Sequence, residues 1–152
     1  MGTAILEEEV EKVYNQLSEE FQNELSFNDL EGLVASFNEG VEEYKLQSQV
    51  PVQNDTHYTW VDQSDSKGIM AIFDKEQTIT GLLFLPLETF PETDQQFTQT
   101  EFILPIQEEW FVFWGGANEL VNYHYAHENQ RYAIDLVIMD EDQTYAGDPT
   151  KK

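Results

Sequence analysis

The stretch YKLQSQVPVQNDTHYTWVDQSDSKGIMAIFDKEQTITGLLFLPL, residues 44–87, decides the fold of the chain. Its β-favouring side chains alternate with polar ones in runs at about residues 44–50, 57–62, 68–74 and 79–87. Asn, Asp, Ser, Gly and Lys separate these runs, and the connections are short, as at residues 74–77. Strands joined by such short connections pair antiparallel. The pattern therefore predicts an antiparallel β meander.

Two helices are predicted before this meander. The first has one apolar stripe at spacings of three and four residues, made of Leu6, Val10, Val13, Tyr14, Leu17, Phe21 and Leu25. Ser26 and Asp29 then form a capping-box pattern, and Leu25 and Leu30 stand where a hydrophobic staple would close. The apolar face of the second helix is Leu30, Leu33, Val34, Phe37 and Val41. Gly40 weakens the helical pattern there, which is typical of a helix end.

The helices are expected to cover the apolar face of the sheet, to which we assign Trp60, Ile72 and Leu83. These features predict an α+β domain over residues 4–88, with two N-terminal helices packed on the antiparallel meander. A small-ligand pocket between helices and sheet is one function that such a domain could have, and a dry, fully packed core would exclude it.

The composition indicates a folded and very acidic protein. Hydrophobic residues make up 40% of the 152 and aromatic residues 13%, which is too much for a disordered chain, even at a formal net charge of -23. Only seven Lys and Arg are present, so nucleic acid and anionic membrane surfaces are not expected partners. The absence of cysteine excludes disulfides and thiolate zinc sites. No apolar run approaches the roughly 18 residues of a transmembrane helix.

The character of the chain changes after the meander. Residues 89–100 are polar, rich in threonine and interrupted by proline, and they are expected to be a linker. A β-rich segment over residues 101–152 follows, with strand-like runs at residues 102–105 and 110–114. The tail from residue 140 is acidic and rich in turn-forming residues.

The sequence WGGANELVNYH at residues 114–124, followed by QRYAIDLV at residues 130–137, carries the most specific pattern. A strand that ends in tryptophan and two glycines, then Asn-x-His, then Tyr-Ala-x-Asp, resembles the start of lysostaphin-like (LytM-type) zinc endopeptidases of bacterial cell walls. The resemblance covers residues 99–150. The preceding helices and meander are similar to a small domain that often precedes this peptidase in secreted Gram-positive proteins.

The resemblance implies that His124 and Asp135 bind zinc, because they match the family's metal-binding histidine and aspartate. Two features depart from the family. The commoner histidine position, four residues before the aspartate, holds Arg131, which is permanently protonated and cannot ligate a metal. The family's later His-x-His motif is absent, since the only histidines are His57, His124 and His127. We therefore expect a zinc half-site only, with no catalytic residues.

Besides a small-ligand pocket, the sequence leaves two functions open. The first is a non-catalytic accessory or targeting region of an extracellular cell-wall zinc metalloendopeptidase, whose partners are peptidoglycan, other wall material or the rest of a peptidase domain. The alternative is a cell-surface binding or interaction protein with a degenerate peptidase-like segment. Both place the protein outside the cell or at its surface.

Three weaker patterns near the motif have simpler explanations. His127 with Glu128 could add a metal ligand, but a surface-loop histidine is the favoured interpretation. Gly115-Gly116 lacks the spacing of a phosphate-binding loop and indicates a turn. The aromatic run at residues 110–114 could stack on sugars or peptides, although one buried sheet face explains it more simply.

Overall fold

The computed structural model describes residues 1–101, 103–104, 106–107 and 109–139. The chain divides into two compact units, Met1–Leu87 and Glu88–Lys152. The first unit combines helices with an antiparallel four-stranded sheet, so the predicted α+β class is confirmed. No helix among the described residues is long and apolar enough to cross a membrane.

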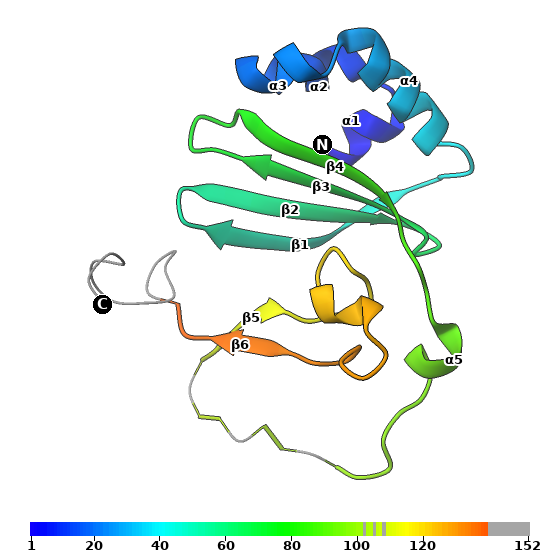
Figure 1. Ribbon diagram of the computed structural model, residues 1–152, viewed down its shortest axis with the longest axis vertical. Helices are drawn as coiled ribbons and strands as arrows, with labels where there is room; N and C mark the ends of the chain where they lie inside the picture. Colours follow the sequence, from blue (N-terminus) through cyan, green and yellow to red (C-terminus); the bar gives the residue numbers. More distant parts are fainter. Residues whose placement is uncertain (102, 105, 108, 140–152) are drawn as a thin grey trace. The chain divides into compact units, whose positions relative to one another are not determined.

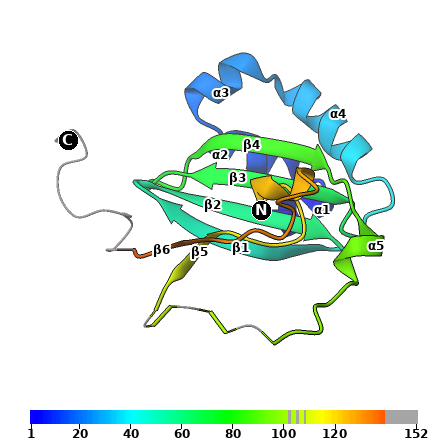
Figure 2. The same ribbon diagram turned by 60° about the horizontal axis from the view of Figure 1, so that its bottom comes forward.

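The sheet of the first unit is the predicted meander. Its strands are β1 (Tyr44–Val52), β2 (Asp55–Asp62), β3 (Lys67–Phe73) and β4 (Ile79–Pro86). They lie in the order β1-β2-β3-β4, and each pairs antiparallel with the next (Figure 2). The prediction succeeds because turn-forming residues mark every connection between runs of alternating character.

The first predicted helix is three short helices in the structure: α1 (Gly2–Leu6), α2 (Val10–Gln16) and α3 (Glu19–Glu24). Two local features break it. Glu8 has φ 55°, which no α-helix accommodates. Leu17 is extended and forms a parallel bridge with Ile79, and the Ser18 amide donates to the Ile79 carbonyl at 3.0 Å. Pairing with the sheet therefore takes precedence over continuation of the helix.

The second predicted helix is α4 (Phe27–Phe37), and its capping pattern forms. The Ser26 hydroxyl accepts from the Asp29 amide at 3.2 Å and donates to the Asp29 carboxylate at 2.5 Å. At the other end, the Lys67 ammonium donates to the carbonyls of Phe37 at 2.8 Å and Glu39 at 2.6 Å. A lysine at this end satisfies unpaired carbonyls and complements the negative end of the helix dipole.

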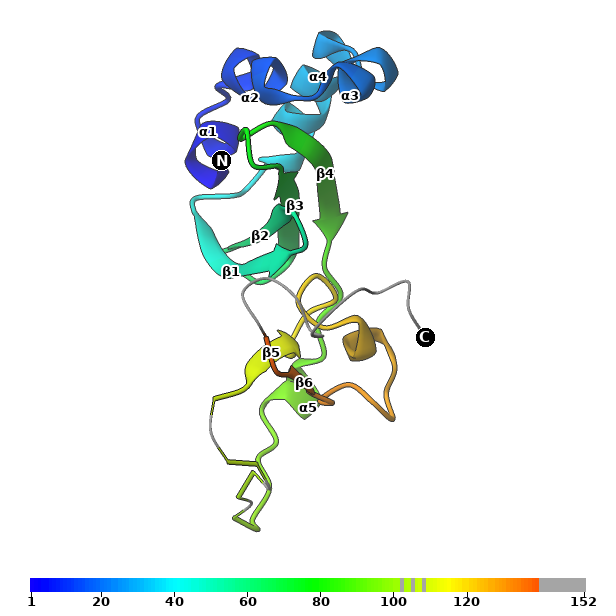
Figure 3. The same ribbon diagram turned by 90° about the vertical axis from the view of Figure 1, so that its left-hand side faces the viewer.

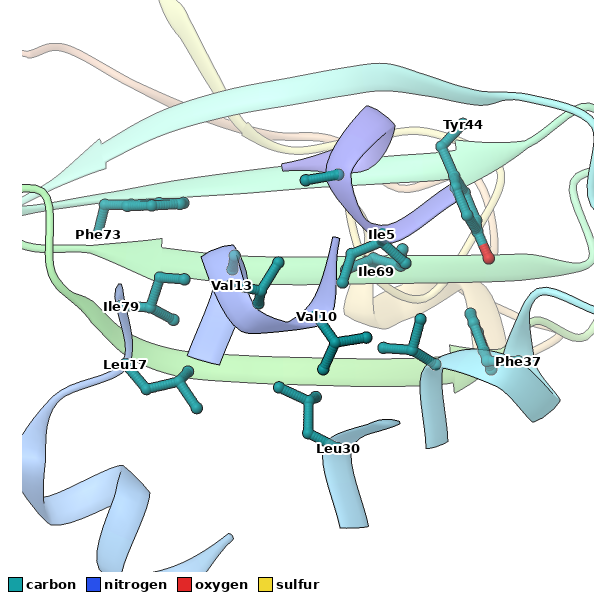
Figure 4. Close-up of a cluster of buried hydrophobic side chains, with 13 residues drawn as sticks. Ile5, Val10, Val13, Leu17, Leu30, Phe37, Tyr44, Ile69, Phe73 and Ile79 are labelled. Carbon is teal, nitrogen blue, oxygen red and sulfur yellow. The ribbon is translucent and has the colours of Figure 1, made fainter. Parts of the chain in front are cut away.

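All four helices lie on one face of the sheet, as the two views of Figure 1 and Figure 3 show. The core between them contains buried side chains from every helix but α3, from the extended Leu17, and from the strands (Figure 4). Its members are Ala4, Ile5, Val10, Val13, Leu17, Leu30, Val34, Phe37, Tyr44, Ile69, Ala71, Phe73 and Ile79. Tyr58, Trp60, Leu82 and Phe84 pack against this core from the sheet.

The assignment of Ile72 and Leu83 to the helix-covered face is wrong. Trp60 lies opposite Ile69 in the β2–β3 ladder, and both side chains pack in the core. Neighbouring residues of a strand project to opposite faces, so Ile72, three residues after Ile69, projects away from the helices. Leu83 lies opposite Met70, which is next to Ile69, and shares that other face. Only Trp60 of the three residues faces the helices.

The β2–β3 turn is organised by the buried carboxylate of Asp62. It accepts from the amides of Ser66 and Lys67, both at 2.7 Å, and from the Ser64 amide and hydroxyl. Burial raises the pKa of the Asp62 carboxyl, but the hydrogen bonds from the Ser64 hydroxyl and from the Lys67 and Ser66 amides together hold it below its ordinary value of 3.8. The turn is therefore stabilised by the ionised form of Asp62.

Asp62→Asn is expected to lower the free energy of unfolding of the first unit by about 1–3 kcal/mol at neutral pH, since the amide nitrogen that replaces one carboxylate oxygen cannot accept hydrogen bonds. A lowered folded pKa adds stability above the unfolded pKa and loses it as the pH falls through the folded value. The difference from wild type should therefore shrink below pH 3.8 in urea unfolding series. Asp65→Asn, at a positive-φ position of the same turn, is the matched control. An equal effect of both changes would contradict the assigned role.

The described residues of the second unit have little regular structure. Its elements are α5 (Pro91–Asp94), β5 (Phe111–Trp114), the 3-10 helix η1 (Tyr123–Ala126) and β6 (Asp135–Val137). β5 and β6 pair antiparallel (Figure 1). The expected β-rich segment thus has two short strands among its described residues, and turns and irregular segments make up most of the rest.

Three sequence predictions concern this unit: the linker, the strand-like run at residues 102–105 and the tail. The expected linker at residues 89–100 contributes α5 to the second unit, where Asp94 accepts hydrogen bonds from residues far along the chain. Ile103 and Leu104 belong to no strand, whereas Phe102 and Pro105 lie outside the described residues. The predicted tail at residues 140–152 lies outside them as well.

Candidate functional site

The two residues that the sequence motif singles out, His124 and Asp135, meet in the structure. His124 lies in η1, and Asp135 is the first residue of β6, opposite Trp114 of β5. Nε2 of His124 is 3.2 Å from Oδ1 of Asp135. The His124 side chain is 10% exposed and that of Asp135 is 41% exposed, so solvent reaches the pair on the carboxylate side.

Asn122 fixes the position of the histidine. Its side-chain oxygen accepts from the His124 amide at 3.2 Å, which caps η1. Its side-chain nitrogen lies 3.1 to 3.2 Å from three carbonyl oxygens, those of Gly116, Arg131 and Ala133. Asn122 is fully buried. One amide therefore joins the turn after β5 to the segment that leads into β6.

The two glycines form a turn, as the sequence predicts. The Gly115 amide donates to the Val121 carbonyl at 2.9 Å, which closes the loop between them. Gly116 has φ 138°, in a region that favours glycine, and a Cβ there would lie 2.7 Å from Cγ2 of Val121. The Asn118 side-chain oxygen accepts from the amides of Leu120 and Val121 at 3.0 and 3.3 Å. The turn sets the path of the chain toward His124.

Arg131, at the position where the peptidase family more commonly has its metal-binding histidine, packs against Phe90, Thr93 and Tyr125. Its side chain is buried, and the guanidinium carbon lies 3.4 Å from the centre of the Phe90 ring. Nε donates to the Tyr125 carbonyl at 3.1 Å, and the guanidinium also donates to the Thr93 hydroxyl at 3.3 Å. A planar guanidinium can stack and donate simultaneously, which a lysine ammonium cannot do.

Asp94 ties α5 to the segment around the site. Its carboxylate accepts from the hydroxyls of Tyr125 and Tyr132, both at 2.8 Å, and from the Phe90 amide at 3.3 Å. Burial raises the pKa of Asp94, but the hydrogen bonds from Tyr132, Tyr125 and the Phe90 amide outweigh it and hold the pKa below its ordinary value. Burial, together with the bond to Asp94, raises the pKa of Tyr125 to about 12.

Aromatic rings line the side of η1 at the histidine. The Tyr123 ring lies over the His124 imidazole with 3.9 Å between centroids, and it meets the Trp114 ring edge-on at 5.4 Å. Tyr123 is half exposed. In β5, Phe111, Phe113 and Trp114 are partly buried and Val112 is exposed. The aromatic run therefore contributes both to packing and to the surroundings of the His–Asp pair.

The geometry of the pair fits two ligands of one zinc ion. Zinc binds histidine nitrogen and carboxylate oxygen at about 2.0 to 2.2 Å, which places two tetrahedral ligands about 3.4 Å apart. The observed separation is 3.2 Å. Among the described residues, however, no group of three or more His, Cys, Asp or Glu side chains could hold a metal. His127 and Glu128 are exposed, and His57 lies in β2 of the first unit.

A groove of about 260 Å³ lies in the first unit at the margin of the core, lined by Met1, Gln16, Tyr58, Trp60, Phe73 and Gln77. It is open and smaller than typical small-molecule sites of about 300–1,000 Å³. No charged side chain lines it. The groove gives the third hypothesis, a small-ligand pocket, only weak support.

The chain matches no known family model, no curated protein and no solved structure. The functional proposal therefore depends on the geometry of the His124–Asp135 pair in the second unit. The resemblance to lysostaphin-like peptidases pointed to His124 and Asp135. It gave no role to Asn122, although the Asn-x-His pattern contains it, nor to Gln130, whose side chain reaches the imidazole.

Proposed function

We propose that this chain is the non-catalytic accessory or targeting region of an extracellular zinc metalloendopeptidase that acts on bacterial cell walls. The observation that carries the proposal is the 3.2 Å approach of His124 Nε2 to Asp135 Oδ1. The resemblance of the sequence around these two residues to zinc endopeptidases implies a zinc centre, and their separation suits that role. Peptidoglycan, other wall material or the rest of a peptidase domain would be the partner.

The proposed zinc half-site consists of His124 and Asp135. Bound zinc in such enzymes activates water for amide hydrolysis. His124 would supply neutral imidazole nitrogen, Asp135 carboxylate oxygen, and Asn122 would hold the histidine through its amide. Two protein ligands are one fewer than catalytic zinc centres use. The chain by itself is therefore proposed to be inactive.

A specific observation favours a second candidate, a cell-surface interaction protein. Among residues 1–101, 103–104, 106–107 and 109–139, no third His, Cys, Asp or Glu completes a metal cluster at the pair. In this alternative, the direct contact of His124 with Asp135 is a structural hydrogen bond that joins η1 to β6. Zinc would then have no effect on the protein.

The proposed targeting role is tested by sedimentation of the chain with purified Gram-positive cell walls, combined with zymography on the same material. We expect the chain to sediment with the walls and to leave them uncleared. His124→Ala is the matched control, because wall binding that does not depend on the half-site should survive this substitution. Cleared walls would refute the claim of inactivity, and a chain that stays in the supernatant would refute the targeting role.

A further inference from the structure

The His124 imidazole has an oxygen acceptor at each ring nitrogen. Nδ1 lies 3.1 Å from Oε1 of Gln130, and Nε2 lies 3.2 Å from Oδ1 of Asp135. Neutral imidazole carries one N–H, so it can donate to only one of the two oxygens. When Nδ1 donates to Gln130, Nε2 presents a lone pair to the Asp135 carboxylate. Without a cation, the Nε2-protonated tautomer avoids this contact between two electron donors by donating to Asp135. With zinc between Nε2 and Asp135, the proton must lie on Nδ1, where Gln130 accepts it.

We propose that Gln130 is a positioning residue that holds the Nδ1-protonated tautomer of His124 and thereby directs the Nε2 lone pair toward Asp135. This inference rests on the proposed zinc half-site and deepens it. The non-ligating nitrogen of a metal-binding histidine almost always donates to an oxygen acceptor, which fixes the tautomer and the orientation of the ring. Gln130 Oε1 stands in that position.

The backbone holds Gln130 on both sides. Its amide donates to the His127 carbonyl at 2.9 Å, and its carbonyl accepts from the Ala133 amide at 2.8 Å. Asn122, which also caps η1, donates to the carbonyls of Arg131 and Ala133, which lie one and three residues after Gln130. The same buried amide thus places both the histidine and the segment that carries its hydrogen-bond acceptor.

The exposure of Gln130 allows its effect on the His124 imidazole to be tested without a large effect on the stability of the unit. Gln130 is exposed, so its side chain contributes little to the packing of the unit. Its removal should leave the fold intact while releasing the imidazole. A glutamate at this position keeps an acceptor oxygen within reach of Nδ1, whereas methionine keeps the approximate length of the side chain without that oxygen. These two substitutions therefore isolate the hydrogen bond.

The test measures zinc affinity by calorimetry for wild type, Gln130→Met, Gln130→Glu and the exposed neighbour Asn129→Ala. We expect the affinity of Gln130→Met to fall by about 10- to 100-fold. Gln130→Glu should retain the wild-type affinity or exceed it, and Asn129→Ala should match wild type. Long-range proton–nitrogen spectra of the zinc-loaded protein should show a protected Nδ1–H on His124 that Gln130→Met loses.

The outcomes distinguish this inference from the function on which it rests. Zinc binding that requires His124 but is equal in wild type and Gln130→Met would overturn the inference and leave the half-site standing. A zinc-loaded ring whose Nδ1 lacks the proton would overturn it as well. Absence of zinc binding in the wild-type chain would overturn both the inference and the proposed half-site.

Discussion

Leu30→Ala is expected to lower the free energy of unfolding of the first unit by about 2–5 kcal/mol. Leu30 is the apolar residue of α4 that follows its capped first turn, and its side chain is fully buried in the core (Figure 4). Alanine removes the transfer free energy of the lost carbons and leaves a cavity that the surrounding elements fill only in part. Urea unfolding followed by far-ultraviolet circular dichroism measures the change through the helices of this unit.

Leu33→Ala is the matched control for Leu30→Ala. Leu33 lies one turn further along α4 and is 38% exposed, so it has more contact with solvent than Leu30. The same substitution there should cost less than about 1 kcal/mol. Equal losses at the two positions would show that the apolar face of α4 does not pack as described.

Arg131→Ala should also have a large effect, a loss of about 2–5 kcal/mol in the stability of the second unit. The substitution removes a charged hydrogen bond, worth about 1.5–3 kcal/mol, to the Tyr125 carbonyl. It also removes the stacking on Phe90, worth about 0.5–2 kcal/mol. Arg131→Lys should fail to restore stability, since an ammonium has no planar face.

Amide hydrogen exchange measures this loss of stability within the second unit. The amides of Gly115 and Tyr125, which donate to Val121 and Asn122, should exchange faster in both Arg131 variants. Lys12→Ala is the control, because Lys12 forms an exposed ion pair with Glu9 and its removal should leave exchange in the second unit unchanged. Full protection in Arg131→Lys would contradict the proposed role of the guanidinium.

The sequence predicts the sheet better than it predicts the helices. The meander is determined by local alternation and by turn residues, which the sequence displays directly. The apolar stripe from Leu6 to Leu25 continues through positions that are not helical. Leu17 has the spacing of a helix face, yet its backbone pairs with Ile79, 62 residues later. Nothing in the local sequence reveals such a contact.

The assignment of sheet faces failed for a different reason. Trp60, Ile72 and Leu83 are all large and apolar, but hydrophobicity does not determine to which face a side chain projects. The pairing of Trp60 with Ile69 determines the faces, and it depends on the register between strands. Where both faces of a strand are apolar, as in β3, alternation gives no guide.

The candidate site was predicted only as far as its motif extends. The motif identified His124 and Asp135, which the structure brings into contact across 11 positions. The supporting contacts, by contrast, join residues that lie far apart in the sequence, so the sequence does not reveal these contacts. Asp94 binds Tyr125 and Tyr132, which lie 31 and 38 residues further along the chain. Gln130 reaches His124 across a turn whose geometry the sequence does not specify.

The most direct test of the proposed function is a calorimetric zinc titration of wild type, His124→Ala and Asp135→Ala, with His127→Ala as the control. The proposed half-site predicts zinc binding by wild type that both site substitutions abolish and that the exposed His127 does not affect. A parallel titration with magnesium should show no binding at the pair, since magnesium prefers oxygen ligands. Absence of zinc binding, or binding that neither site substitution changes, would contradict the half-site and favour the interaction protein.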